Sequence, residues 1–182
     1  MKKNEINNFR IGDEIPNFHI KPISRSMLNL YATASGDHNP IHIDSDYAKK
    51  SGLPDVIAHG MLIMSFLGQT ITNIFPQGSI KKFESKFIAM TNINDCLTCK
   101  GKIINIELKD SLKRFSFKLL VIDSSGKKKL SGSAIVELKL NEKTLPDLLK
   151  KIRGHFTILL TMSKSQPNKT ILSRWSSCFS RV

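Results

Sequence analysis

The sequence lacks the features that mark secreted, membrane-spanning and disulfide-stabilised proteins. Its 182 residues include three cysteines, an odd and sparse set that predicts free thiols rather than a disulfide framework. No stretch reaches the roughly 18 consecutive apolar residues of a membrane span. The N-terminal segment has lysines but neither the apolar core nor the cleavage site of a secretory signal. We therefore expect a cytoplasmic protein with no membrane span.

Acidic residues are also scarce, because 15 Asp and Glu face 28 Lys and Arg, which gives a formal net charge of +13. Such a chain attracts anions: nucleic acid, a membrane surface, an acidic carrier protein or a phosphate-bearing small molecule. Nucleic-acid-binding modules interleave aromatic with basic side chains, and aromatic residues make up only 7% of this chain, so we expect no nucleic-acid partner. The lysine runs at 81–82, 127–129 and 150–151 are typical of solvated turns, although some could dock phosphates.

The first half of the chain has helical periodicity. Residues 24–35 start with a serine cap and stop at Gly36, which predicts a short helix. Asp44 caps a second short helix that ends before Gly52. Residues 61–75 form a third helix whose first two turns are apolar on almost every side, and such a helix is expected to be buried all round.

Alternating apolar residues predict strands in the rest. We expect a short edge strand near residues 18–20, then strands over 83–89, 97–108, 114–122 and 134–140. A buried helix followed by an antiparallel meander indicates an α+β architecture in which the sheet curls about the helix. This domain is assigned to residues 1–142. Residues 143–182 form a basic C-terminal extension, with a short helix over 145–152 and a poorly ordered remainder.

The loop at residues 36–43, Gly-Asp-His-Asn-Pro-Ile-His-Ile, carries the first candidate for chemistry. Pro40 prevents a regular helix there, so Asp37 and His42 are free to converge. A carboxylate and an imidazole facing one pocket can act as an acid–base pair on water and carbon. The same residues are also good turn formers. Asn39 shares the ambiguity, because it could fix the loop or orient the imidazole.

His59 and Gly60 stand immediately before the apolar helix. The free N–H groups and positive dipole at a helix start can stabilise an oxyanion, and glycine lets a carbonyl oxygen approach the backbone closely. The structural alternative makes Gly60 a helix cap and His59 a buried histidine with a satisfied hydrogen bond. Both residues are therefore candidates for oxyanion or thioester binding, and the functional interpretation depends on the Asp–His loop.

Two other patterns suggest metal ligands and neither is convincing. His38 and His42 would share a face only on a helix, which Pro40 prevents. Cys96 and Cys99 form one C-x-x-C inside a predicted strand, where they would point to opposite faces, and the second ligand pair of a zinc site is missing. We expect no metal and no cofactor.

Taken together, three segments closely resemble the MaoC-like hydratases and dehydratases of the hot-dog fold. They are Y-A-T-A-S-G-D-H-N-P-I-H-I-D at residues 31–44, A-H-G-M-L at 58–62, and F-E-S-K-F at 83–87. The resemblance covers about residues 9–140. It implies an α+β hot-dog fold, with a long buried helix wrapped by a curved antiparallel sheet. It assigns no role to residues 143–182.

The resemblance also implies an activity, the reversible addition of water to a trans-2-enoyl thioester to give the (3R)-3-hydroxyacyl thioester. By resemblance Asp37 and His42 are the catalytic pair of this hydro-lyase, Asn39 supports them, and Gly60 with His59 binds the thioester carbonyl. Which of Asp37 and His42 is the formal base stays open, because coupled groups share a titration. The family further implies a homodimer with a continuous sheet across the interface.

The sequence leaves three candidate functions open. The leading one is an (R)-specific enoyl-CoA hydratase acting on acyl-CoA. A 3-hydroxyacyl-[acyl-carrier-protein] dehydratase of fatty-acid synthesis differs only in its carrier, and the positive charge fits both substrates. A non-catalytic acyl-thioester-binding hot-dog protein is the alternative from another class, and it would not need the intact set Asp37, Asn39 and His42.

Overall fold

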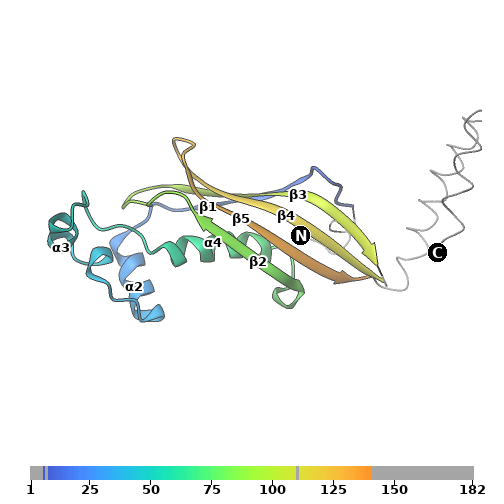
Figure 1. Ribbon diagram of the computed structural model, residues 1–182, viewed down its shortest axis with the longest axis horizontal. Helices are drawn as coiled ribbons and strands as arrows, with labels where there is room; N and C mark the ends of the chain where they lie inside the picture. The colour runs from blue at the N-terminus through green and yellow to red at the C-terminus, as the bar shows by residue number, and fades with distance from the viewer. Residues whose placement is uncertain (1–5, 7, 110, 141–182) are drawn as a thin grey trace, which may run out of the picture. The chain divides into compact units, whose positions relative to one another are not determined.

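The computed structural model describes residue 6, residues 8–109 and residues 111–140, and its strands form a single five-stranded antiparallel sheet (Figure 1). The order across the sheet is β1-β3-β4-β5-β2, which leaves β1 and β2 at the edges. The strands are β1 (Glu14–Ile20), β2 (Ile80–Phe87), β3 (Leu97–Lys109), β4 (Leu112–Asp123) and β5 (Lys128–Lys139). The five predicted strands are therefore confirmed, but with different bounds: β1 and β5 begin earlier than expected, and β2 covers 80–87 rather than 83–89.

Helix α4 (Gly60–Thr72) packs on one face of this sheet, against β1, β2, β3 and β4 (Figure 1). Its buried residues Leu62, Leu67 and Ile71 join one apolar cluster with the inward side chains of the strands. Burial of such side chains contributes about 2 kcal/mol each. The residues of α4 thus anchor the helix whose N-terminus carries Gly60.

Two expectations about α4 are wrong. The helix ends at Thr72 rather than at residue 75, because Asn73 caps it and a 3₁₀ turn, η2 (Gln77–Ser79), follows. Burial all round is contradicted by Met61, which is 50% exposed, and by Ser65 and Gln69, which are also exposed. The reason is that the sheet covers one side of the helix.

The segment before α4 folds as predicted into two short helices and a turn. Helix α2 (Arg25–Ser35) begins at Ser24, whose side chain accepts a hydrogen bond from the Met27 N–H. It ends at Gly36, whose φ of 74° is a left-handed conformation that glycine adopts without strain. A 3₁₀ helix, η1 (Pro40–His42), and helix α3 (Ser45–Lys50) follow, the latter capped by Asp44. Figure 1 shows α2 and α3 beyond the N-terminal end of α4.

The exposure of the lysine and cysteine side chains agrees only in part with the expectations from the sequence. Lys129 is only 4% exposed, so interpreting the whole run 127–129 as a solvated turn is wrong for this residue. The expected placement of both cysteines in one strand is wrong, because β3 begins at Leu97: Cys96 precedes it and is exposed, whereas Cys99 lies within it and is buried. Burial raises the pKa of the Cys99 thiol to about 11. In the described part of the chain, no helix combines the length and the hydrophobicity that a membrane crossing requires. The helix expected over 145–152, with the rest of 143–182, lies outside the described residues.

Two strand glycines test how tightly the sheet is packed. A Cβ on Gly132 would lie 2.6 Å from the backbone oxygen of Glu84 in the neighbouring strand, which cannot move without breaking the β2–β5 pairing. A Cβ on Gly101 would instead meet Ile15 and Leu119 side-chain atoms at 2.7–3.0 Å, and these can rotate. We expect Gly132→Ala to lower the free energy of unfolding by about 2 kcal/mol and Gly101→Ala by about 1 kcal/mol or less. Urea denaturation measures both, and equal losses would contradict this packing argument.

Candidate active site

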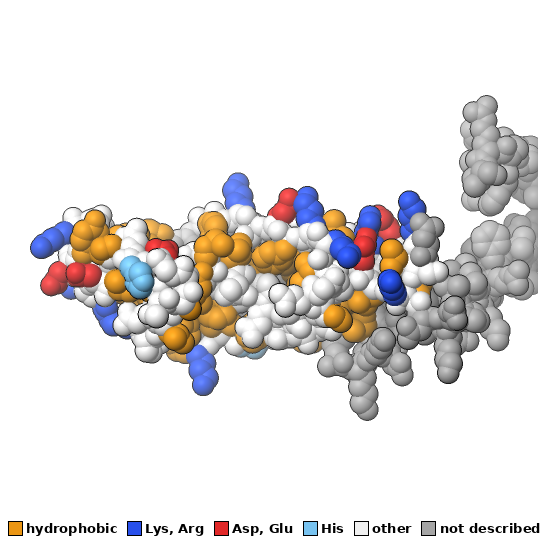
Figure 2. All heavy atoms as spheres, turned by 90° about the horizontal axis from the view of Figure 1, so that it is seen from below, with side chains coloured by type: hydrophobic (Ala, Val, Ile, Leu, Met, Phe, Trp, Pro, Cys, Tyr) orange, Lys and Arg blue, Asp and Glu red, His pale blue; other side chains and the backbone are white. Residues whose placement is uncertain are grey.

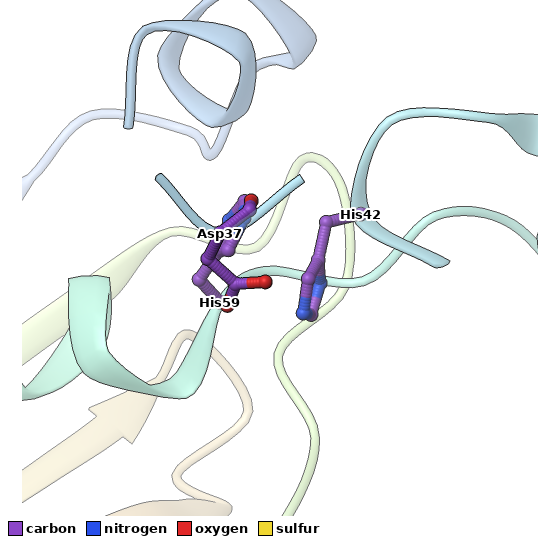
Figure 3. Close-up of side chains that lie close together, drawn as sticks. All are labelled: Asp37, His42 and His59. Atoms are coloured by element: carbon purple, nitrogen blue, oxygen red, sulfur yellow. The ribbon is translucent and has the colours of Figure 1, made fainter. Parts of the chain in front are cut away.

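Three polar side chains from separate segments meet at the N-terminal end of α4 (Figure 3). Asp37 comes from the loop after α2, His42 from the end of η1, and His59 from the residue before α4. One ligand-type atom from each lies within 4.8 Å of the others. The structure thus brings Asp37 and His42 together and adds His59 to them.

The ring of His42 has a defined orientation and tautomer. Its Nδ1 lies 2.7 Å from the backbone oxygen of Ile57. A carbonyl oxygen can only accept, so Nδ1 carries the proton and donates it in this bond. In the neutral ring the Nε2 lone pair is then free to accept a proton.

His59 is 1% exposed and is fixed by contacts to both neighbours. Its Nε2 donates a hydrogen bond to the backbone oxygen of Asp37 at 3.1 Å, and its ring stacks on His42 with centroids 3.9 Å apart. Tyr31 contacts the ring at a centroid distance of 5.0 Å. Burial, with a smaller contribution from nearby His42, lowers the pKa of His59, although the bond to the Asp37 carbonyl opposes this. His59 is therefore neutral at neutral pH.

Asn39 organises the loop. Its side-chain oxygen accepts a hydrogen bond from the Ile41 N–H at 3.2 Å and so caps η1. Its own N–H donates to an oxygen of the Asp37 carboxylate at 3.3 Å. Its backbone oxygen accepts a hydrogen bond from the His42 N–H at 3.1 Å, and within the described residues the Asn39 side chain makes no hydrogen bond to the His42 ring. The contacts of Asn39 are therefore those of a residue that shapes the loop and orients Asp37.

Gly60 begins α4 without a side-chain cap, because the N-cap residue His59 makes no capping hydrogen bond. Among the described residues, no side chain therefore accepts a hydrogen bond from the first N–H groups at the positive dipole end of the helix. Gly60 also lines a pocket of about 280 Å³ whose walls are largely apolar. The other lining residues are mostly apolar, with Thr91 and Lys129 as the polar ones: Ala58, Ile63, Phe87, Ile88, Ala89, Met90, Thr91, Lys129 and Leu130.

The same cluster has the residue types of a metal site, but the orientation of its rings is unfavourable. A bound ion lies close to the plane of each imidazole, about 2 Å from the nitrogen. The His42 and His59 rings are stacked at 29° to each other, so their lone pairs do not converge on one point. In addition, Nδ1 of His42 and Nε2 of His59 are already engaged with backbone oxygens.

Two residues that the sequence did not single out hold the cluster. One is Ile57, which acts through its backbone oxygen, so no side-chain pattern could reveal it. The other is Asp55, which accepts hydrogen bonds from Arg25 of α2, from Ser45 of α3 and from the Val56 N–H. The Val56 N–H, followed by the Arg25 and Ser45 side chains, lowers the pKa of Asp55. Only the position of Asp55 next to Pro54 hinted at an ordered turn.

Comparison of the sequence with known proteins shows a family match over most of the described residues. The family model described as "MaoC like domain" matches residues 7–123. A protein of Rhodospirillum rubrum named (R)-specific enoyl-CoA hydratase is 32% identical over 118 residues, which are 64% of this chain and 80% of that one. The fatty acid synthase beta subunit TOXC of Cochliobolus carbonum is 34% identical over 78 residues, which are 41% of this chain but 4% of that subunit.

Solved structures agree on the fold. The structure titled R-Hydratase PhaJ1 from Pseudomonas aeruginosa, in the unliganded form, superposes with a TM-score of 0.64 and 24% sequence identity. The match covers 75% of this chain and 85% of that one, and the shared arrangement is the α+β hot-dog fold. Since the family model covers more than half of the sequence, the chain belongs to the MaoC-like dehydratase domain family.

Proposed function

We propose that this protein is a hydro-lyase that interconverts a trans-2-enoyl-CoA and the (3R)-3-hydroxyacyl-CoA, with Asp37 and His42 as its acid–base pair. The observation that carries the proposal is the convergence of these two side chains, within 4.8 Å, beside the uncapped start of α4. Membership of the MaoC-like family supports the reaction class, and a relative is named for (R)-specific hydration of enoyl-CoA.

In the hydration direction, water adds across the double bond of the thioester. The oxygen of water bonds to C3 while the water loses a proton to the pair, for which Nε2 of His42 has a free lone pair. The π electrons move toward the thioester carbonyl, and the resulting enolate oxygen is stabilised by the Gly60 N–H and the helix dipole. The pair then gives a proton to C2 to complete the product, and the proton that it took from water restores its starting protonation state.

The pocket beside Gly60 suits the acyl part of such a substrate. Its lining is mostly apolar, and it opens next to the N–H that would hold the thioester carbonyl. The net charge of +13 favours either phosphate-bearing coenzyme A or an acidic carrier protein, so a 3-hydroxyacyl-carrier-protein dehydratase is the alternative with the same chemistry.

Substitution of the pair tests the activity. We expect Asp37→Asn and His42→Ala each to lower kcat by about 10² to 10⁴-fold in hydration of a short trans-2-enoyl-CoA, with the (3R) product from the wild type. His38→Ala, in the same loop but exposed, is the matched control and should keep its activity.

Carrier-protein thioesters of several chain lengths form the second arm of this assay. Turnover confined to them would favour the dehydratase of fatty-acid synthesis. A wild type that binds both kinds of thioester and turns over neither would contradict the catalytic proposal and favour an acyl-binding protein.

Removal of one N–H tests the oxyanion role of Gly60. Gly60→Pro deletes this N–H at a helix position where proline is well tolerated, and the φ of −57° and ψ of 126° at His59 suit a residue that precedes proline. Gly60→Ala introduces the same Cβ, 3.0 Å from the Phe87 ring, but keeps the N–H. We expect kcat of Gly60→Pro to fall about 10²-fold below that of Gly60→Ala. Similar kcat values for the two variants would remove Gly60 from the mechanism.

We further propose that the protein is a homodimer joined along the edge strand β2. Among the described strands, β2 pairs with β5 alone, and its last residue, Phe87, is 51% exposed. The segment that follows adds two more exposed apolar side chains, Ile88 (49%) and Met90 (59%). Figure 2 shows hydrophobic side chains reaching the surface on one face of the described region. A second copy would continue the sheet and cover these side chains.

The mass in solution tests this assembly. Light scattering should give about twice 20.5 kDa for the wild type and the monomer mass for Ile88→Glu, because a carboxylate at a buried interface is costly. Leu30→Glu, on α2 and 72% exposed, should stay dimeric. A wild-type monomer at tens of micromolar would refute the dimer.

A further inference from the structure

Lys129 is a buried cation at the start of β5, outside the Asp37–His42–His59 cluster. Its Nζ lies 2.7 Å from a carboxylate oxygen of Asp95 and 3.2 Å from one of Asp123, and it donates a hydrogen bond to the Met90 backbone oxygen at 3.1 Å. The Lys129 side chain is 4% exposed, and those of Asp95 and Asp123 are 22% and 10% exposed. Three charges gathered with so little solvent form a specific arrangement rather than a surface ion pair.

These contacts fasten the segment 88–95, which joins β2 to β3. The backbone oxygen of Lys129 accepts hydrogen bonds from Ile88 N–H (2.9 Å) and Ala89 N–H (3.2 Å). Lys129 therefore binds the segment through its backbone as well as through its ammonium group. Further along, the carboxylate of Asp95 also accepts from the Asn92 N–H at 2.9 Å. Lys129 and Asp95 together therefore set the path of the backbone from residue 88 to residue 95.

That backbone in turn holds the acceptor of His42. The Thr91 oxygen accepts a hydrogen bond from the Ala58 N–H at 2.8 Å, and Asn92 forms a β-bridge with Ile57. The oxygen of Ile57 is the group that receives the Nδ1–H of His42. A continuous series of contacts therefore runs from the Lys129 ammonium, through two short backbone segments, to the imidazole.

We propose that Lys129 and Asp95 are positioning residues for His42, which hold the Ile57 carbonyl where it selects the Nδ1–H tautomer of the ring. The inference rests on the proposed function for its catalytic meaning, since only the Nδ1–H tautomer leaves Nε2 free to accept a proton from water. The wrong tautomer of a catalytic histidine costs activity even when the rest of the site is intact.

Lys129, Asp95 and Asp123 form a charged triad, and the charges of Lys129 and Asp123 do not change near neutral pH. Burial alone would lower the pKa of Lys129, but Asp95 and Asp123 outweigh it and raise this pKa. Hydrogen bonds, first among them that from Ser125, lower the pKa of Asp123 to about 2. The titratable groups that face His42 itself are Asp37 and His59, neither of which belongs to the triad. A substitution of Lys129, Asp95 or Asp123 therefore acts on His42 through the backbone contacts of residues 91–92 with residues 57–58, and not through a direct contact with the ring.

The direct test is the ¹⁵N NMR spectrum of the full chain labelled at histidine, with His42 assigned through His42→Gln, because imidazole ¹⁵N shifts distinguish the two tautomers. We expect the Nδ1–H form of His42 in the wild type. Lys129→Met and Asp95→Asn should give a mixture with the Nε2–H form and lower kcat by about 10-fold with little change in KM. Asp95→Asn changes the shape of its side chain very little, so it keeps the test available if Lys129→Met does not fold.

Two controls separate positioning from general loss of stability. Asp123→Asn breaks the other ion pair of Lys129 but leaves its contacts to Asp95 and Met90, and Arg114→Gln breaks the Arg114–Glu137 pair between β4 and β5. Both should keep the wild-type tautomer. An unchanged His42 tautomer in Asp95→Asn would overturn the inference. A wild type that turns over no thioester would instead defeat the proposed function, while the tautomer measurement would still decide the positioning role.

Discussion

The apolar contact between α4 and the sheet determines where every site residue lies. Leu62, Leu67 and Ile71 hold the helix on the strands, and this fixes the position of its first residue at one end of the sheet. His59 immediately precedes that residue, and the loops with Asp37 and His42 are built around His59. A shift of the helix along the sheet would therefore move the uncapped N–H groups and the imidazole cluster together.

The polar cluster is held mainly by backbone oxygens. His42 donates to the Ile57 carbonyl and His59 donates to the Asp37 carbonyl, while Asn39 caps η1 through its side chain. Backbone groups are suited to this task because their positions depend on two φ/ψ angles rather than on long rotatable side chains. The segment 56–59 supplies one oxygen and one of the rings, so its anchors at Asp55 and at residues 91–92 have a large influence on the geometry.

Much of this arrangement could be predicted from local sequence signals. Ser24, Gly36 and Asp44 predicted helix ends because capping involves neighbouring residues, and alternation predicted all five strands. The loop sequence correctly suggested that Asp37 and His42 could meet. What could not be predicted depends on contacts distant in sequence. The partial exposure of Met61 follows from which side of α4 the sheet covers, and the burial of Lys129 follows from Asp95 and Asp123 folding against it. The Ile57 oxygen has no side-chain signature.

The stacked imidazoles of His42 and His59 limit how much positive charge the cluster can hold. With centroids 3.9 Å apart and His59 shut away from solvent, two imidazolium rings would repel each other in surroundings that screen charge poorly. Burial lowers the pKa of His59, so the buried ring stays neutral at neutral pH and the stacked pair does not carry two positive charges. In the proposed reaction, the stacked pair must therefore release one proton before it accepts another.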